Sequence, residues 1–152
     1  MLEAAILRAL KPRHLLFLCV QNSARSQLAE GIARFLAPQG VTVSSAGSSP
    51  AFVRPQAIQV LKEIGIDISG HRSKAIEEID AASVDAVVTL CAEEVCPVFP
   101  GDAVRLHWGL PDPAKAPGGE AARLEAFRAT RDELFKRLKL LFDGWGAVPA
   151  GG

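Results

Sequence analysis

The fold is decided by the stretch His14-Leu-Leu-Phe-Leu-Cys19-Val-Gln-Asn-Ser-Ala-Arg25-Ser26. Its first six residues form a short apolar run of the kind that buried parallel strands show. Residues 26–36 follow with apolar side chains at helical spacing, and Pro38 and Gly40 end this pattern. The stretch therefore predicts a strand, a tight loop and a helix, which together open a parallel α/β fold.

The rest of the chain continues this alternation of strands and helices. We predict further strands at residues 41–46, 84–90 and 103–107, and helices at 55–64, 73–79 and 120–142. Residues 108–119 hold three prolines and three glycines and are predicted to form a loop. The pattern indicates one flavodoxin-like α/β domain at residues 14–143, with a four-stranded parallel sheet and helices on both faces. Residues 1–13 are expected to be an arm or short helix, and residues 144–152 a loose tail.

Composition excludes several classes of function. The chain has 152 residues, enough for one domain with a sizeable core, and 17 basic residues balance 17 acidic ones. This balance argues against nucleic-acid binding, and no apolar run is long enough to span a membrane. Glu3 stands where a secretion signal would carry positive charge, so we expect a cytoplasmic protein. Its three cysteines should then be reduced thiols.

Three polar candidates fall at one edge of the predicted sheet. Cys19 ends the first strand, Cys91 follows the third, and Asp112 follows the fourth. Parallel α/β sheets bind their ligands beyond the carboxyl ends of the strands. The sequence therefore predicts a functional site where these three residues converge.

The loop after the first strand has the features of an anion site. A strand-to-helix loop can turn its N–H groups inward, and the positive field at the helix N-terminus stabilises a thiolate at Cys19. Arg25 can offer a planar fork of donors to the anion. The alternative, a buried inert cysteine beside a solvated arginine, is disfavoured by this spacing. Arg72 and Lys74 are expected to be ordinary solvated side chains. The predicted oxyanion-binding loop comprises Val20, Gln21, Asn22, Ser23, Ala24, Arg25 and Ser26.

The run from Leu18 to Glu30 resembles the signature loop of the low-molecular-weight protein tyrosine phosphatase fold, and more narrowly that of thioredoxin-coupled arsenate reductases built on this fold. The resemblance covers most of the chain. It implies arsenate as substrate, with phosphate or sulfate as analogues, thioredoxin as electron donor, and no tightly bound cofactor. It continues through Ser45-Ala-Gly-Ser48, Gly65-Ile-Asp-Ile68, His71-Arg-Ser-Lys74 and His107-Trp-Gly109.

The resemblance also implies a role for each reactive residue. Cys19 attacks arsenate while Asp112 protonates the leaving oxygen, although an Asp before Pro is often only a turn residue. Cys91 then attacks Cys19, and Cys96 attacks Cys91, so that the disulfide reaches the surface. Tyrosine phosphatases typically carry aromatic residues after the Asp-Pro pair. Ala114 and Lys115 stand there in a chain without tyrosine, which favours a small inorganic anion.

Two other roles are open to Cys91 and Cys96. A zinc site lacks a convincing set of four ligands, so we predict no metal; inert core cysteines are disfavoured because Glu93 and Glu94 make the segment polar. A helix through both cysteines would separate their Cα atoms by roughly 8–9 Å, beyond the roughly 7 Å limit for a disulfide. We therefore expect an irregular segment, or one that unwinds on oxidation. The functional alternatives are a phosphatase for small esters and a non-catalytic oxyanion or thiol redox sensor.

Overall fold

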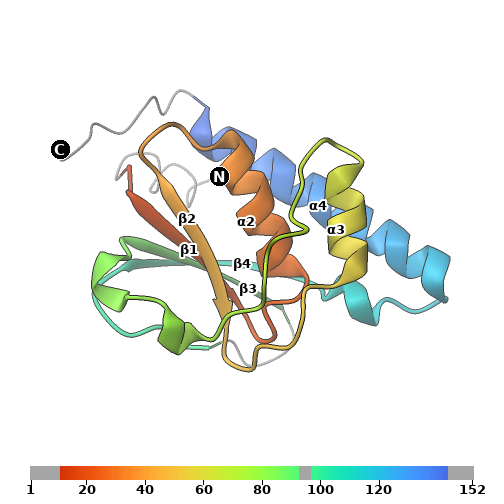
Figure 1. Ribbon diagram of the computed structural model, residues 1–152, viewed down its shortest axis with the longest axis horizontal. Helices are drawn as coiled ribbons and strands as arrows, with labels where there is room; N and C mark the ends of the chain where they lie inside the picture. Colours follow the sequence, from red (N-terminus) through yellow and green to blue (C-terminus); the bar gives the residue numbers. More distant parts are fainter. Residues whose placement is uncertain (1–10, 93–96, 144–152) are drawn as a thin grey trace.

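The computed structural model describes residues 11–92 and 97–143, and this part of the chain forms a parallel four-stranded sheet in the order β2-β1-β3-β4 (Figure 1). The prediction of a four-stranded parallel α/β fold is confirmed. The strands are β1 (His14–Cys19), β2 (Thr42–Gly47), β3 (Ala86–Cys91) and β4 (Val104–Leu110). The helices are α2 (Arg25–Leu36), α3 (Pro55–Lys62) and α4 (Glu120–Phe142), with 3-10 turns η1 (Ile76–Glu78), η2 (Ala81–Ser83) and η3 (Pro113–Lys115).

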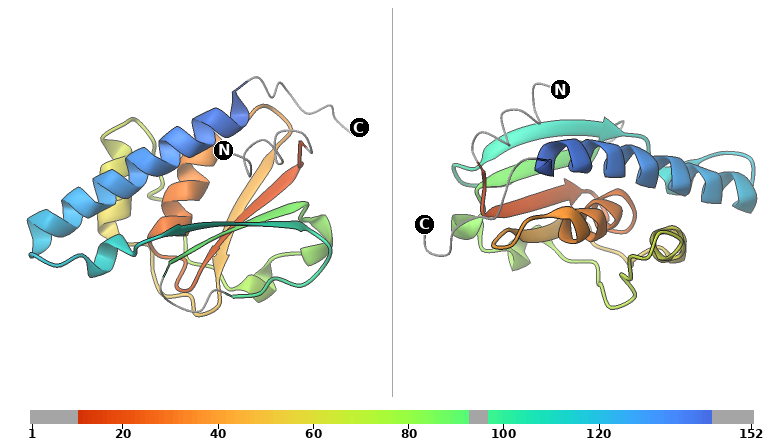
Figure 2. Two further views of the ribbon diagram at one scale, coloured as in Figure 1. Left: turned by 180° about the vertical axis from the view of Figure 1, so that it is seen from behind. Right: turned by 90° about the horizontal axis from the view of Figure 1, so that it is seen from above.

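Helices cover both faces of the sheet, but unequally. The three α-helices of the described residues gather on one side, and η1 and η2 lie on the other (Figures 1 and 2). Alternation along β1 explains this division, because Leu15 and Phe17 belong to the core under the α-helices while Leu16 and Leu18 face the opposite side. Phe99 fills the smaller second core. The sheet is therefore buried on both faces, as an all-parallel sheet requires.

The long helix α4 covers α2 and α3 with a stripe of fully buried side chains, namely Phe127, Leu134, Leu138 and Leu141. Its exposed side is tied to the end of α3, where Glu63 pairs with Arg128 at 2.7 Å and with Arg131 at 2.8 Å. The hydrogen bonds from Arg128 lower the pKa of Glu63 to about 2, so this carboxylate is ionised over the whole neutral range.

The predicted helix at residues 73–79 is wrong. Only η1 forms there, because the preceding backbone bonds to other elements: the Lys74 carbonyl accepts from the Gly47 N–H at 2.9 Å, and Ala75 forms a bridge with Gly47.

The fourth strand is also longer than predicted, since it continues through Gly109 to Leu110 and ends only at Pro111. The predicted loop is shorter by the same residues and contains η3.

The predicted N-terminal arm and C-terminal tail lie mostly outside the described residues, so the domain boundaries stay predictions. Within residues 11–92 and 97–143, no helix is both long and apolar enough to cross a membrane.

Candidate active site

The loop between β1 and α2 starts at Cys19, which is paired with Gly47 on β2 and is only 2 % exposed. Its thiol lies 2.9 Å from the hydroxyl of Ser26 in the first turn of α2. A hydroxyl at this distance can donate to a thiolate, and α2 directs its N-terminal N–H groups toward the same region. Strand, loop and helix thus place the cysteine where negative charge is stabilised.

Asn22 organises the loop from behind. It is fully buried and adopts a left-handed conformation with φ 50°. Its amide nitrogen donates to Ser26 Oγ at 2.8 Å and to Ser45 Oγ at 2.9 Å, and its Oδ1 accepts from the Lys74 N–H at 2.8 Å. The Ser73 hydroxyl donates to its carbonyl at 2.7 Å. Because the side-chain nitrogen, the side-chain oxygen and the carbonyl of buried Asn22 all form hydrogen bonds, they hold the loop in one conformation.

The segment after β2 orients the peptide groups of the loop. The carbonyls of Val20 and Ser23 accept hydrogen bonds from Ser49 at 2.8 Å and Arg54 at 2.9 Å. The peptide bonds are trans, so each following N–H points the opposite way. The N–H groups of Gln21 and Ala24 therefore turn away from this segment, toward the pocket that both residues line.

The loop encloses a small pocket at the carboxyl edge of the sheet. Most of the predicted loop residues line it, while Asn22 and Ser26 support it from behind. Asp112 joins them as predicted, and Lys115 does so without having been predicted. The full lining is Cys19, Val20, Gln21, Ser23, Ala24, Arg25, Asp112 and Lys115.

Arg25 connects this pocket to the other half of the sheet. It is 4 % exposed, and its Nη1 donates to the carbonyl of Leu110 at 2.9 Å and of Leu90 at 3.5 Å, at the ends of β4 and β3. Its Nη2 lies 4.0 Å from Asp112 Oδ2. The other oxygen of Asp112 accepts from the Ala114 N–H at 3.0 Å and caps η3. Asp112 is thus a turn residue that also faces the pocket; its acid role stays a prediction.

Cys91 lies at the predicted edge but does not line the described pocket. It ends β3, the neighbour of β1, and is 1 % exposed. The β3–β4 register shifts between Thr89 and Cys91, and Cys91 belongs to neither of the two core clusters. The thiol of Cys19 faces α2. Cys96 lies outside the described residues, so its relation to Cys91 stays a prediction.

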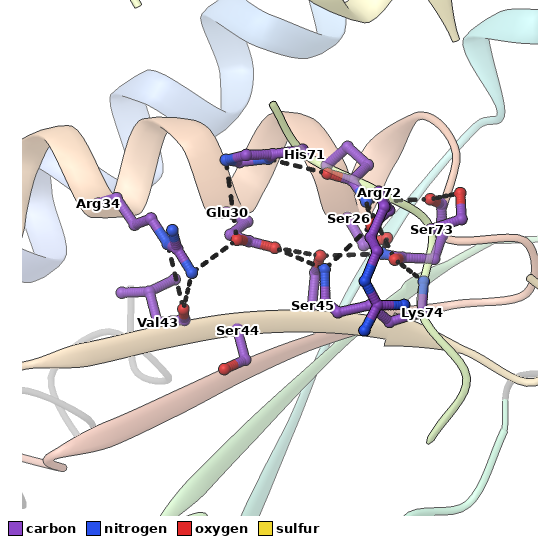
Figure 3. Close-up of polar contacts among 12 residues, drawn as sticks. Ser26, Glu30, Arg34, Val43, Ser44, Ser45, His71, Arg72, Ser73 and Lys74 are labelled. Carbon is purple, nitrogen blue, oxygen red and sulfur yellow. Dashed lines mark hydrogen bonds and ion pairs between the residues drawn. The ribbon is translucent and has the colours of Figure 1, made fainter. Parts of the chain in front are cut away.

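A buried carboxylate supports the loop from α2 and was missed by the sequence analysis. Glu30 is 2 % exposed and accepts a hydrogen bond from the Ser45 hydroxyl (Figure 3). The same hydroxyl accepts a hydrogen bond from the Asn22 amide. Arg34 at 2.9 Å and Lys74 at 3.5 Å balance its charge. Ser26 and Glu30 lie four residues apart on one face of α2, and this polar spacing at core positions was the available signal.

His71 completes this cluster above Glu30 (Figure 3). Its Nδ1 lies 3.0 Å from Gln27 Oε1, and its Nε2 lies 3.9 Å from Glu30. Burial lowers the pKa of His71, although the charge of Glu30 raises it. The expectation of ordinary surface residues was correct for Arg72, which is exposed and pairs with Glu78, but wrong for Lys74, which is 18 % exposed beside Glu30.

Fold and site together define a class of α/β proteins that hold a tetrahedral anion in a strand-to-helix loop and present a cysteine thiol to it. The chain belongs to the low molecular weight phosphotyrosine protein phosphatase family, whose model matches residues 14–147. It is 46 % identical over 125 residues to an arsenate reductase of Halalkalibacterium halodurans, covering 81 % of this chain and 90 % of that relative.

Two solved structures are similar over most of the chain. One, an arsenate reductase in the phosphate binding state, has a TM-score of 0.73 at 34 % identity and covers 88 % of this chain and 99 % of that one. The other, a thioredoxin-dependent arsenate reductase from Corynebacterium glutamicum, has a TM-score of 0.58 at 30 % identity. It covers 91 % of this chain and 70 % of that one.

Proposed function

We propose that this protein reduces arsenate to arsenite with three cysteines, and that thioredoxin supplies the electrons. The observation that carries the proposal is Cys91 at the end of β3, beside the strand that carries Cys19. A phosphatase of this family needs one thiol and water, whereas reduction of As(V) takes two electrons and therefore two thiols. The similarity to proteins named arsenate reductases supports the same conclusion.

In the first step the Cys19 thiolate attacks arsenic and forms a sulfur–arsenic bond. One arsenate oxygen leaves as water after receiving a proton, for which Asp112 is the positioned donor. The inward N–H groups of Gln21 and Ala24, together with Arg25, hold the remaining oxygens and stabilise their charge. This step resembles phosphoryl transfer, which explains why one loop serves both anions.

In the second step the thiolate of Cys91 attacks the sulfur of Cys19. The sulfur–arsenic bond breaks, its electron pair stays on arsenic, and arsenite leaves as a Cys19–Cys91 disulfide forms. The thiolate of Cys96 then attacks Cys91, which frees Cys19 and leaves a Cys91–Cys96 disulfide for thioredoxin. Because Cys91 is buried and does not line the pocket that contains Cys19, the second step requires Cys91 to move from its place at the end of β3.

The test is an assay of arsenate-dependent NADPH oxidation coupled through thioredoxin and its reductase. Each Cys→Ser variant should lose steady-state turnover. In a single turnover without thioredoxin, Cys96→Ser should still release one arsenite per protein and trap a Cys19–Cys91 disulfide, whereas Cys91→Ser should release none. Arsenite release by Cys91→Ser equal to that of Cys96→Ser would contradict the proposed order of the relay.

Hydrolysis of small phosphate esters is the second candidate, because the described pocket contains Cys19, Arg25 and Asp112 without Cys91. This combination of nucleophile, cation and acid suffices for phosphoryl transfer to water. A chromogenic phosphate ester decides between the two. Turnover of the ester that survives Cys91→Ser together with Cys96→Ser, with no arsenate reduction by the wild type, would favour the phosphatase.

A further inference from the structure

Lys115 lines the oxyanion pocket beside Cys19, Arg25 and Asp112. Its side chain is exposed at the mouth of the pocket. Among the described residues, no ion pair or side-chain hydrogen bond uses its ammonium group, whereas most of the other basic side chains near the site have carboxylate or carbonyl partners. The charge of Lys115 is thus available to a bound anion.

The backbone of Lys115 is held rigidly relative to Asp112. Its N–H donates to the Asp112 carbonyl at 3.1 Å, and Asp112 Oδ1 caps the same turn through Ala114. Pro113 between them is buried and fixes its own φ angle. Only the side chain of Lys115 is therefore free to adjust, and the ammonium remains within reach of the mouth of the pocket.

A second cation at the pocket would strengthen the binding of a dianion, because negative groups there offset the charge of Arg25. Arg25 is the buried cation of the site, but Asp112 lies 4.0 Å from it and offsets its charge when ionised. A thiolate at Cys19 adds a further negative charge, and arsenate near neutral pH carries up to two. A second positive charge at the entrance therefore adds to the stabilisation that a dianion receives from Arg25 and the N–H groups of the loop.

We propose that Lys115 is a further binding residue of this pocket, whose ammonium contacts an outer oxygen of a tetrahedral dianion and selects small, doubly charged anions. The inference rests on the proposed function for the identity of the substrate, but not for the binding itself. A lysine also removes the aromatic wall that would hold a phenyl ring. Lys115 thus favours doubly charged anions through its charge, and small anions over aryl esters through its shape.

The test measures anion binding without any turnover. Iodoacetamide alkylates the Cys19 thiolate, its modification is followed by peptide mass, and increasing phosphate or sulfate protects it. Lys115→Gln should weaken the protection by both anions by about 5- to 20-fold, because an exposed charge-assisted contact is lost. Lys115→Arg should retain it. Lys139→Gln removes the same charge from the last turn of α4 and serves as the matched control.

A structural role for Lys115 would not produce the same salt dependence. At high ionic strength the difference between Lys115→Gln and the wild type should shrink, since screening removes the electrostatic part of binding. The proposal is overturned if Lys115→Gln is protected within twofold of the wild type, or if Lys139→Gln loses as much. Absent arsenate turnover with protection that still depends on Lys115 would instead refute only the proposed reductase function.

Discussion

The sharpest consequence of the site's construction concerns Gly47, the last residue of β2. A Cβ atom added there would contact only backbone atoms. It would lie closer to the Val20 carbonyl oxygen than Cβ atoms are found in real structures, and 2.8 Å from the Asn22 nitrogen. Backbone atoms, unlike a side chain, cannot avoid the clash by changing rotamer. Gly47→Ala must therefore push the anion loop away from β2.

The size of this shift can be worked from the same contacts. Ordinary van der Waals contact for a Cβ begins at 3.4 Å, so the Asn22 nitrogen must retreat by about 0.6 Å from its 2.8 Å separation. Catalytic geometry tolerates displacements of only about 0.5 Å, and a shift near 1 Å costs about 100-fold in rate. We expect Gly47→Ala to lower kcat/KM for arsenate by roughly 10- to 100-fold, and overpacking to lower the free energy of unfolding by about 1–3 kcal/mol.

Gly70→Ala is the matched control, because an added Cβ there meets nothing within 4 Å. Urea unfolding separates the cost in stability from the cost in catalysis, and protection of Cys19 by phosphate reports the loop directly. The expected pattern is a folded Gly47→Ala protein with weakened protection, and a Gly70→Ala protein like the wild type. Wild-type phosphate binding and turnover in Gly47→Ala would refute the claim that this close approach fixes the loop.

Two further outcomes follow from the site. Arg25→Lys should lower kcat/KM for arsenate by about 100-fold and weaken the protection of Cys19 by phosphate. The reason is that an ammonium group cannot hold the Leu90 and Leu110 carbonyls and still present a planar fork of donors. Wild-type kcat/KM together with wild-type protection would contradict the role of Arg25. Burial lowers the pKa of His71 from its ordinary 6.5, so the stability it contributes is complete above about pH 6.5 and is lost as the pH falls through the lower folded-state value. The urea midpoint of unfolding should therefore fall as the pH is lowered from about 7.5 to 5, and His71→Gln should make this pH dependence weaker. An unchanged pH dependence in His71→Gln would show that His71 does not cause it.

The loop and the sheet edge were predictable because local pattern determines them. An apolar run, a Cys-to-Arg spacing and a helical periodicity lie within 23 consecutive residues, from His14 to Leu36. The short helix predicted after His71 failed for the opposite reason. Ser73 bonds to Asn22, 51 positions earlier, and Ala75 forms a bridge with Gly47, 28 positions earlier. No local propensity reveals such distant partners. Lys74 was misjudged in the same way, since its partner Glu30 is buried on a distant helix.

The two halves of the sheet carry different parts of the chemistry, and Arg25 links them. The half built on β1 and β2 shapes an anion loop that serves phosphatases and reductases alike. The residues proposed here to distinguish a reductase are Cys91 at the end of β3 and Lys115 in η3, the turn that follows β4. Arg25 bonds to the Leu90 carbonyl, which belongs to the peptide that joins Leu90 to Cys91. In the proposed relay, movement of Cys91 toward Cys19 would therefore disturb Arg25, and this contact would couple formation of the disulfide to release of arsenite.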